Sequence, residues 1–151
     1  KNVIESGVII ALDDVRDPGN LGTIIRSAAA FNISTIILSE NTVDLYNPKV
    51  LRATQGMHFH INIISMSSID AVTKLKENNY LVLGTNVENG YDVRDIDNID
   101  KFCLVMGNEG NGVRKEIQDM CDKNLYIKTN SKVESLNVGV ACSILLYELG
   151  R

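Results

Sequence analysis

The sequence predicts an α/β domain in which helices cover both faces of a parallel β-sheet. Short apolar runs rich in β-branched residues alternate along the chain with segments whose apolar residues recur at helical spacing. Continuous apolar runs are typical of strands that are buried on both faces, and the helical spacing is typical of amphipathic helices. Because the two kinds of segment alternate, the strands are expected to be parallel and joined by crossover helices.

The patterns place each element in chain order. Strands are expected at residues 7–12, 33–38, 59–64, 80–85, 102–106 and 124–127. Helices are expected at residues 21–31, 47–54, 69–77 and 113–121, with Asn20 as the N-cap of the first and Pro48 in the first turn of the second. Residues 87–99 are rich in Asp, Asn and Gly and are expected to form a polar loop.

The last helix is apolar around nearly its whole circumference. It follows Asn137, its expected N-cap, and its apolar residues are Val138, Val140, Ala141, Cys142, Ile144, Leu145, Leu146 and Leu149. A helix of this kind is expected to be buried on all sides. A partner subunit would supply cover that one sheet face cannot, and the alternative is a helix buried within the monomer.

Composition limits the classes of function. The 151 residues, 44% of them hydrophobic, fit one domain, and a net charge of −4 argues against a broadly basic nucleic-acid surface. Neither a membrane span nor a signal peptide is recognisable, so a cytoplasmic protein is expected. Because the chain begins at Lys1 rather than Met, we expect it to be a domain excised from a longer protein.

Cysteine and histidine usage does not predict a metal centre. Cys103, Cys121 and Cys142 are widely spaced in apolar surroundings, which favours reduced core thiols over a disulfide or metal framework. His58 and His60 would share one face of the expected strand at 59–64. Since no third ligand accompanies them, no metal is expected there.

Three polar loops follow the carboxyl ends of predicted strands, where parallel sheets bind ligands. They span residues 13–20, 107–112 and 128–137. The second contains Gly107, Gly110 and Gly112, which permit close approach to the backbone. It has neither the Gly-Lys-Ser/Thr ending of a P-loop nor the spacing of a dinucleotide fingerprint.

The order of these loops resembles the SpoU (TrmH-like) family of RNA ribose 2′-O-methyltransferases, in the SPOUT superfamily. Asp-Pro-Gly-Asn-Leu-Gly precedes a helix with an arginine, Met-Gly-Asn-Glu-Gly-Asn-Gly follows, and Ser-Leu-Asn-Val precedes the last helix. The family's three motifs match residues 13–31, 104–113 and 127–141, and residues 47–54 match the stretch between them. The chain departs from the usual third motif at Lys128, Thr129, Ser131 and Gly139.

The resemblance implies a C-terminal deep trefoil knot, a homodimer with active sites at its interface, S-adenosylmethionine as cofactor and RNA as substrate. Ribosomal RNA is favoured slightly over transfer RNA, and an additional N-terminal domain often selects the RNA in this family. Neither a metal nor a membrane is implied. The cofactor-binding residues implied are Gly84, Thr85, Met106, Gly107, Ile127 and Leu136.

The catalytic residues implied are Arg26, Asn20, Glu109, Ser135 and Asn137. Arg26 lies off the apolar stripe of its helix, so packing does not require it. Because a guanidinium with a pKa above about 12 is a poor base, positioning of a phosphate or hydroxyl is the favoured role. A solvated helix arginine is the alternative for Arg26, as a turn position is for Glu109 and capping is for the others.

Basic residues near the loops are candidates for phosphate contacts, although scattered solvated side chains remain the alternative. They are Arg16, Lys49, Arg52, Arg114, Lys128 and Lys132.

Two rival functions remain open. A doubly wound oxidoreductase would explain the alternation of elements but lacks Gly-x-Gly-x-x-Gly. A non-catalytic RNA-binding paralogue would keep the fold, but the five catalytic candidates argue against it.

Overall fold

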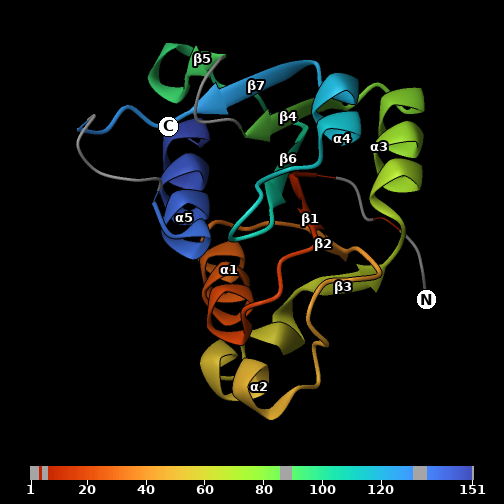
Figure 1. Ribbon diagram of the computed structural model, residues 1–151, viewed down its shortest axis with the longest axis vertical. Helices are drawn as coiled ribbons and strands as arrows, with labels where there is room; N and C mark the ends of the chain where they lie inside the picture. Colours follow the sequence, from red (N-terminus) through yellow and green to blue (C-terminus); the bar gives the residue numbers. More distant parts are fainter. Residues whose placement is uncertain (1–3, 5–6, 86–89, 131–135, 151) are drawn as a thin grey trace.

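The computed structural model describes residues 4, 7–85, 90–130 and 136–150. Its strands are β1 (Ile9–Asp13), β2 (Thr35–Leu38), β3 (Asn62–Ser65), β4 (Leu81–Thr85), β5 (Tyr91–Asp92), β6 (Phe102–Gly107) and β7 (Lys123–Tyr126). They form one sheet in the order β3-β2-β1-β6-β4-β7-β5, and every pairing between these strands is parallel (Figure 1). The predicted parallel α/β fold is therefore confirmed.

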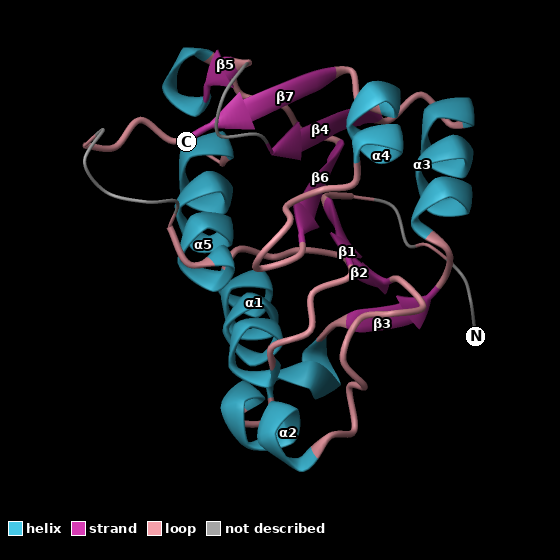
Figure 2. Ribbon diagram, viewed as in Figure 1, coloured by secondary structure: helices cyan, strands magenta, loops and turns pink. Residues whose placement is uncertain are grey.

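Helices cover both faces of the sheet. Helices α1 (Pro18–Ala30), α2 (Pro48–Thr54) and α5 (Val138–Leu149) lie on one face, and α3 (Ser68–Glu77) and α4 (Lys115–Met120) lie on the other (Figure 2). The alternation of side chains along β1 builds the two halves of the core. Ile10 and Leu12 pack in the cluster of α1 and α5, whereas Ile9 and Ala11 pack in the cluster of α3 and α4.

The first helix begins three residues earlier than predicted. Asp17 is its N-cap, and the Oδ2 atom of Asp17 accepts a hydrogen bond from the Asn20 backbone N–H at 2.9 Å. Pro18 occupies the first helical turn, where its missing N–H and fixed φ are tolerated. The prediction that Asn20 caps this helix is therefore wrong, and the Asn20 side chain is available for another contact.

The segment around the two histidines is not a strand. Residues Met57–His60 form a 3₁₀ helix, η1, and β3 starts only at Asn62. Gln55 and Gly56 both have left-handed backbone conformations, which turn the chain sharply after α2. His58 and His60 therefore do not share a strand face. Within the described residues no cluster of three His, Cys, Asp or Glu side chains is arranged to bind a metal.

The predicted polar loop at 87–99 contains regular structure in its described part. Tyr91 and Asp92 pair with Leu125 and Tyr126 of β7 as strand β5, and a 3₁₀ helix, η2, covers Val93–Asp95. The Asp92 carboxylate caps η2 by accepting from the Arg94 backbone N–H at 3.0 Å. A two-residue strand is too short to produce a periodic pattern, so no local pattern predicts it.

Helix α5 is only partly buried by its own chain. Its buried face consists of Gly139, Cys142, Leu145, Leu146 and Leu149. In contrast, Val140 is 46% exposed and Tyr147 is 64% exposed, and the Tyr147 ring meets the exposed Phe31 of α1 edge-on at 6.3 Å. The prediction of burial on all sides is therefore not met within one chain.

The three thiols are free, as predicted, and Cys103 and Cys142 are fully buried. Burial raises the pKa of Cys142 to about 12 and, with the charge of Asp122, that of Cys121 to about 11. None of the described helices is long and apolar enough to cross a membrane.

Candidate active site

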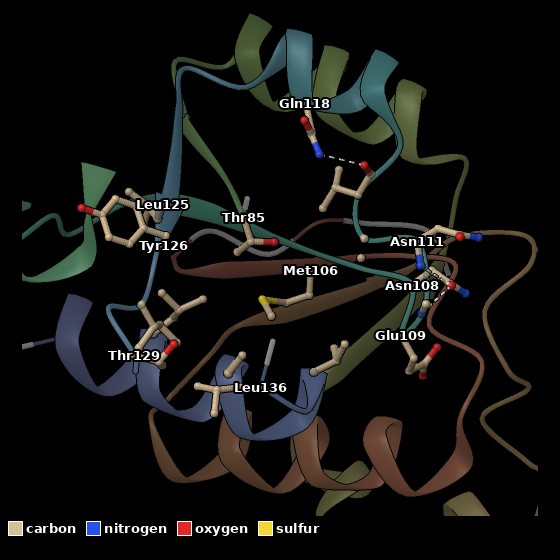
Figure 3. A pocket seen from close by; sticks show the side chains of 18 of the residues that line it. Thr85, Met106, Asn108, Glu109, Asn111, Gln118, Leu125, Tyr126, Thr129 and Leu136 are labelled. Carbon is tan, nitrogen blue, oxygen red and sulfur yellow. Dashed lines mark hydrogen bonds between the residues drawn. The ribbon is translucent and has the colours of Figure 1, made fainter. Parts of the chain in front are cut away.

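A cavity of about 660 Å³ opens at the carboxyl ends of β4, β6 and β7. Figure 3 shows Met106 in the middle of this cavity, with Gln118 on one wall and Leu136 on the opposite wall. Five of the six residues predicted to bind a cofactor line it, namely Thr85, Met106, Gly107, Ile127 and Leu136. Gly84 is not among the lining residues, because Asn124 and Cys121 fill the space beside it.

The wall of the cavity combines apolar side chains with polar groups, and two of the polar side chains bond to the backbone. Its larger apolar side chains are Met106, Leu125, Ile127, Leu136 and Leu145. The Gln118 side-chain amide donates to the Val113 carbonyl at 3.0 Å, and the Thr85 hydroxyl donates to the Val105 carbonyl at 3.1 Å. Such a lining suits a flat apolar ring, and the volume falls within the usual range of ligand pockets.

The loop after β6 is rigidly folded back on itself. The backbones of Asn108 and Gly112 exchange two hydrogen bonds, at 3.1 and 2.9 Å. The Asn108 side-chain oxygen accepts from the backbone N–H groups of Gly110 and Asn111, and its amide donates to the Asp14 carbonyl at 2.8 Å. The loop is thereby fixed to the end of β1.

Glu109 joins this loop to the start of α1. Its carboxylate accepts from the Arg16 backbone N–H at 3.0 and 3.1 Å and from the Asp17 backbone N–H at 2.8 Å. It also accepts from the Asn20 side-chain amide at 3.3 Å. Partial burial raises the pKa of Glu109, but the backbone hydrogen bonds from Arg16 and Asp17 outweigh it and hold the pKa below its usual value. The carboxylate is therefore ionised at neutral pH and orients Asn20.

An ion pair between the buried Asp13 and the partly exposed Arg114 fixes the other end of the loop. The fully buried Asp13 carboxylate accepts from the Arg114 guanidinium at 2.8 and 3.0 Å, from the Arg114 backbone N–H at 3.0 Å and from the Ser68 hydroxyl at 3.0 Å. Burial raises the pKa of Asp13, but these bonds outweigh burial and lower it below 3.8. Sequence reasoning missed this anchor. An aspartate that ends a buried apolar strand was the available signal.

We expect Asp13→Asn to lower the free energy of unfolding by about 2 kcal/mol, because it removes the charge of a fully buried carboxylate that accepts hydrogen bonds from Arg114 and Ser68. Asp119→Asn is the matched control, since it breaks an exposed ion pair with Lys115 and should cost less than about 0.5 kcal/mol. Urea titration measures both values. The folded-state pKa of Asp13 is depressed, so its contribution should be constant near neutral pH and should shrink as the pH falls below 3.8. A pH-independent difference would contradict this assignment.

The other catalytic candidates surround one stretch of α1. Asn20 is buried against Glu109, whereas Arg26 is exposed about two turns further along the helix. Between them, Thr23 lies against Gly139 of α5, where a Cβ would come within 3.1 Å of it. Asn137 caps α5 by accepting from the Val140 backbone N–H at 3.2 Å and is not itself a lining residue. Ser135 lies outside the described residues.

The comparisons with known proteins bear on the family of this chain. The model of the SpoU rRNA Methylase family matches residues 7–147. The chain belongs to this family. Among its relatives is the 23S rRNA (guanosine(2553)-2′-O)-methyltransferase RlmP of Bacillus subtilis, which is 41% identical over 141 residues. The match covers 93% of this chain and 57% of that enzyme, so the chain spans little more than half of the relative's length.

Solved structures of two methyltransferases agree with the fold. The AdoMet-bound rRNA methyltransferase of Sinorhizobium meliloti is 36% identical, with a TM-score of 0.89 over 97% of this chain and 57% of that chain. The SpoU methyltransferase AviRb of Streptomyces viridochromogenes, in complex with AdoMet, is 28% identical with a TM-score of 0.89, covering 97% and 60% of the two chains.

Proposed function

We propose that this chain is the catalytic domain of an RNA ribose 2′-O-methyltransferase that uses S-adenosylmethionine. One observation carries the proposal. The loop that lines the cavity also bonds, through Glu109, to the helix that bears Asn20 and Arg26. A cofactor cavity and a set of polar groups suited to an RNA ribose therefore meet at one edge of the sheet.

The cavity fits the cofactor by size and by chemistry. The apolar side chains of Met106, Ile127 and Leu136 would hold the adenine ring, and the backbone at Gly107 would approach it closely. S-adenosylmethionine would supply a methyl group activated by a sulfonium charge, with the S–CH₃ bond breaking to leave a neutral thioether as the new bond to the ribose 2′-oxygen forms. The hydroxyl proton would pass to water. The remaining work of the protein is alignment, which accounts for roughly 7 to 11 kcal/mol of the barrier in well-oriented reactions.

Each polar side chain has a separate role in aligning the RNA. Arg26 holds an RNA phosphate or the ribose hydroxyl by hydrogen bonding, since a guanidinium does not lose its proton at neutral pH. Asn20 bonds the ribose while Glu109 fixes its orientation. Asn137 holds the start of α5 in place as its N-cap and, with Ser135, completes the site.

We also propose that two copies of the chain associate through α1 and α5, because Val140, Tyr147 and Phe31 leave an apolar strip exposed there. After β7, near one edge of the sheet, the chain returns to place α5 beside α1, and we propose that this return forms a trefoil knot. Reduced thiols fit action in the cytoplasm.

Ribosomal RNA is the favoured substrate, as the name of the B. subtilis relative suggests, and a further domain outside this chain selects the RNA.

Calorimetric titration of the chain with S-adenosylmethionine and with NAD tests the cofactor assignment. We expect saturable binding of S-adenosylmethionine, abolished by Leu136→Asp in the cavity wall, and no binding of NAD. Tight NAD binding without S-adenosylmethionine binding would support the oxidoreductase alternative and end the proposal. Binding of S-adenosylmethionine and RNA without methyl transfer would instead identify a non-catalytic paralogue.

A further inference from the structure

A surface formed by α2, η1 and the residues just before α2 combines exposed aromatic rings with basic side chains. Phe59 is 81% exposed and Tyr46 is 70% exposed, and the side chains of Lys49 and Arg52 lie in exposed positions between them in sequence. Residues 45–69 contain no Asp or Glu, although the whole chain has 19. We call this the α2–η1 surface. It is a cationic, aromatic region on an otherwise acidic protein.

Contacts that start in the core hold the Phe59 ring in place. The hydroxyl of the buried Thr54 donates to the Leu51 carbonyl and lies 2.9 Å from Nδ1 of His58. The His58 ring in turn lies against the Phe59 ring, with 4.0 Å between centroids and an interplanar angle of 37°. An exposed phenylalanine would ordinarily be free to rotate. Here its ring is oriented in advance, which lowers the entropy lost when a ligand stacks on it.

The α2–η1 surface is continuous with the candidate active site. Gly22 of α1 lies so close to α2 that a Cβ at this position would overlap Ala53, the residue next to Arg52. Arg26 lies one turn beyond Gly22 on the same side of α1. Figure 1 shows α2 lying beside α1. A strand of RNA held at Arg26 would therefore pass directly onto this surface.

We infer that the α2–η1 surface binds the single-stranded RNA that flanks the target ribose, with a base stacked on Phe59 and phosphates held by Lys49 and Arg52. Unpaired bases present flat faces that stack on aromatic side chains, whereas a duplex conceals them. The lack of Asp and Glu in residues 45–69, which Asp44 precedes, matches a polyanion better than it matches a second copy of this acidic chain. The inference rests on the proposed function, because it assumes an RNA substrate.

Fluorescence anisotropy with a labelled single-stranded oligoadenylate and an RNA duplex of equal length tests the inference on the purified chain. We expect the single strand to bind more tightly, and Phe59→Ala to raise its Kd about tenfold, a loss typical of one base–aromatic stack. Phe59→Trp should restore binding. Tyr91→Ala is the matched control, since Tyr91 is also exposed but lies on β5, and its Kd should equal that of the wild type.

A salt titration gives an independent readout. The double variant Lys49→Ala/Arg52→Ala should reduce the slope of log Kd against log salt concentration by about 1.4, as expected for two lost phosphate contacts on a single strand. Wild-type affinity of Phe59→Ala, equal binding of duplex and single strand, or a change in oligomeric state on sedimentation of Phe59→Ala would each overturn the inference. If these RNA effects appear but S-adenosylmethionine does not bind, the proposed function fails while the surface assignment stands.

Discussion

Replacing Arg26 with alanine is expected to lower kcat for RNA methylation by about 10²- to 10³-fold, the typical cost of losing one preorganised hydrogen-bond donor at a reacting centre. The Kd for S-adenosylmethionine should change little, because Arg26 is not among the residues that line the cavity. Single-turnover assays at saturating RNA, together with calorimetry, separate the two quantities. Because the side chain is exposed and packing does not depend on it, the loss of rate should not be accompanied by a loss of folding stability.

Two further variants complement Arg26→Ala: one separates charge from donor geometry, and the other is a control. Arg26→Lys keeps the charge but loses the planar set of donors, so it should recover only a small part of the lost rate. Lys74→Ala removes an exposed cation from α3 on the opposite face of the sheet and should leave the rate unchanged. Methylation at the wild-type rate by Arg26→Ala would remove this residue from the mechanism.

Gly107→Ala is expected to lower the free energy of unfolding by about 2 to 3 kcal/mol, the cost of strong overpacking. A Cβ at Gly107 would overlap the backbone of Gly112 and Val113, which cannot move without opening the Asn108–Gly112 hydrogen bonds. Because this loop lines the cavity, the Kd for S-adenosylmethionine should also rise at least about tenfold.

Gly110→Ala is the matched control for the loop. A Cβ at this position would have its nearest neighbour, the Asn108 side-chain oxygen, at 3.5 Å, which is an ordinary contact. Stability by urea titration and cofactor affinity by calorimetry should therefore remain close to the wild type. Equal effects of the two substitutions would show that the loop is not held as rigidly as its hydrogen bonds indicate.

Patterns repeated over several residues predicted the fold well. Each predicted strand overlaps an observed one, and α2 starts one residue after its predicted start with Pro48 in the first turn as expected, because apolar runs and proline positions are local signals. Very short elements, and elements that depend on contacts with distant residues, leave no such pattern in the sequence. The two-residue β5 depends on its pairing with β7, and the 3₁₀ helix at 57–60 depends on two left-handed residues before it.

The candidate site was only partly predictable for the same reason. The three loops could be placed from the ends of predicted strands, and the described parts of all three lie at one edge of the sheet. The partner of Glu109 could not be placed. Its carboxylate accepts hydrogen bonds from Arg16, Asp17 and Asn20, and no local pattern in the sequence points to these partners. Contacts between residues some ninety positions apart in sequence become visible only in the folded chain.

The most direct test of the central claim is mass spectrometry of nucleosides from ribosomal RNA transcribed in vitro and incubated with the chain and S-adenosylmethionine bearing a deuterated methyl group. We predict a deuterated methyl group on the ribose of one nucleoside, absent when Arg26→Ala replaces the wild-type chain. A deuterated methyl group on a base, or none at all although the chain binds both the RNA and S-adenosylmethionine, would contradict the account.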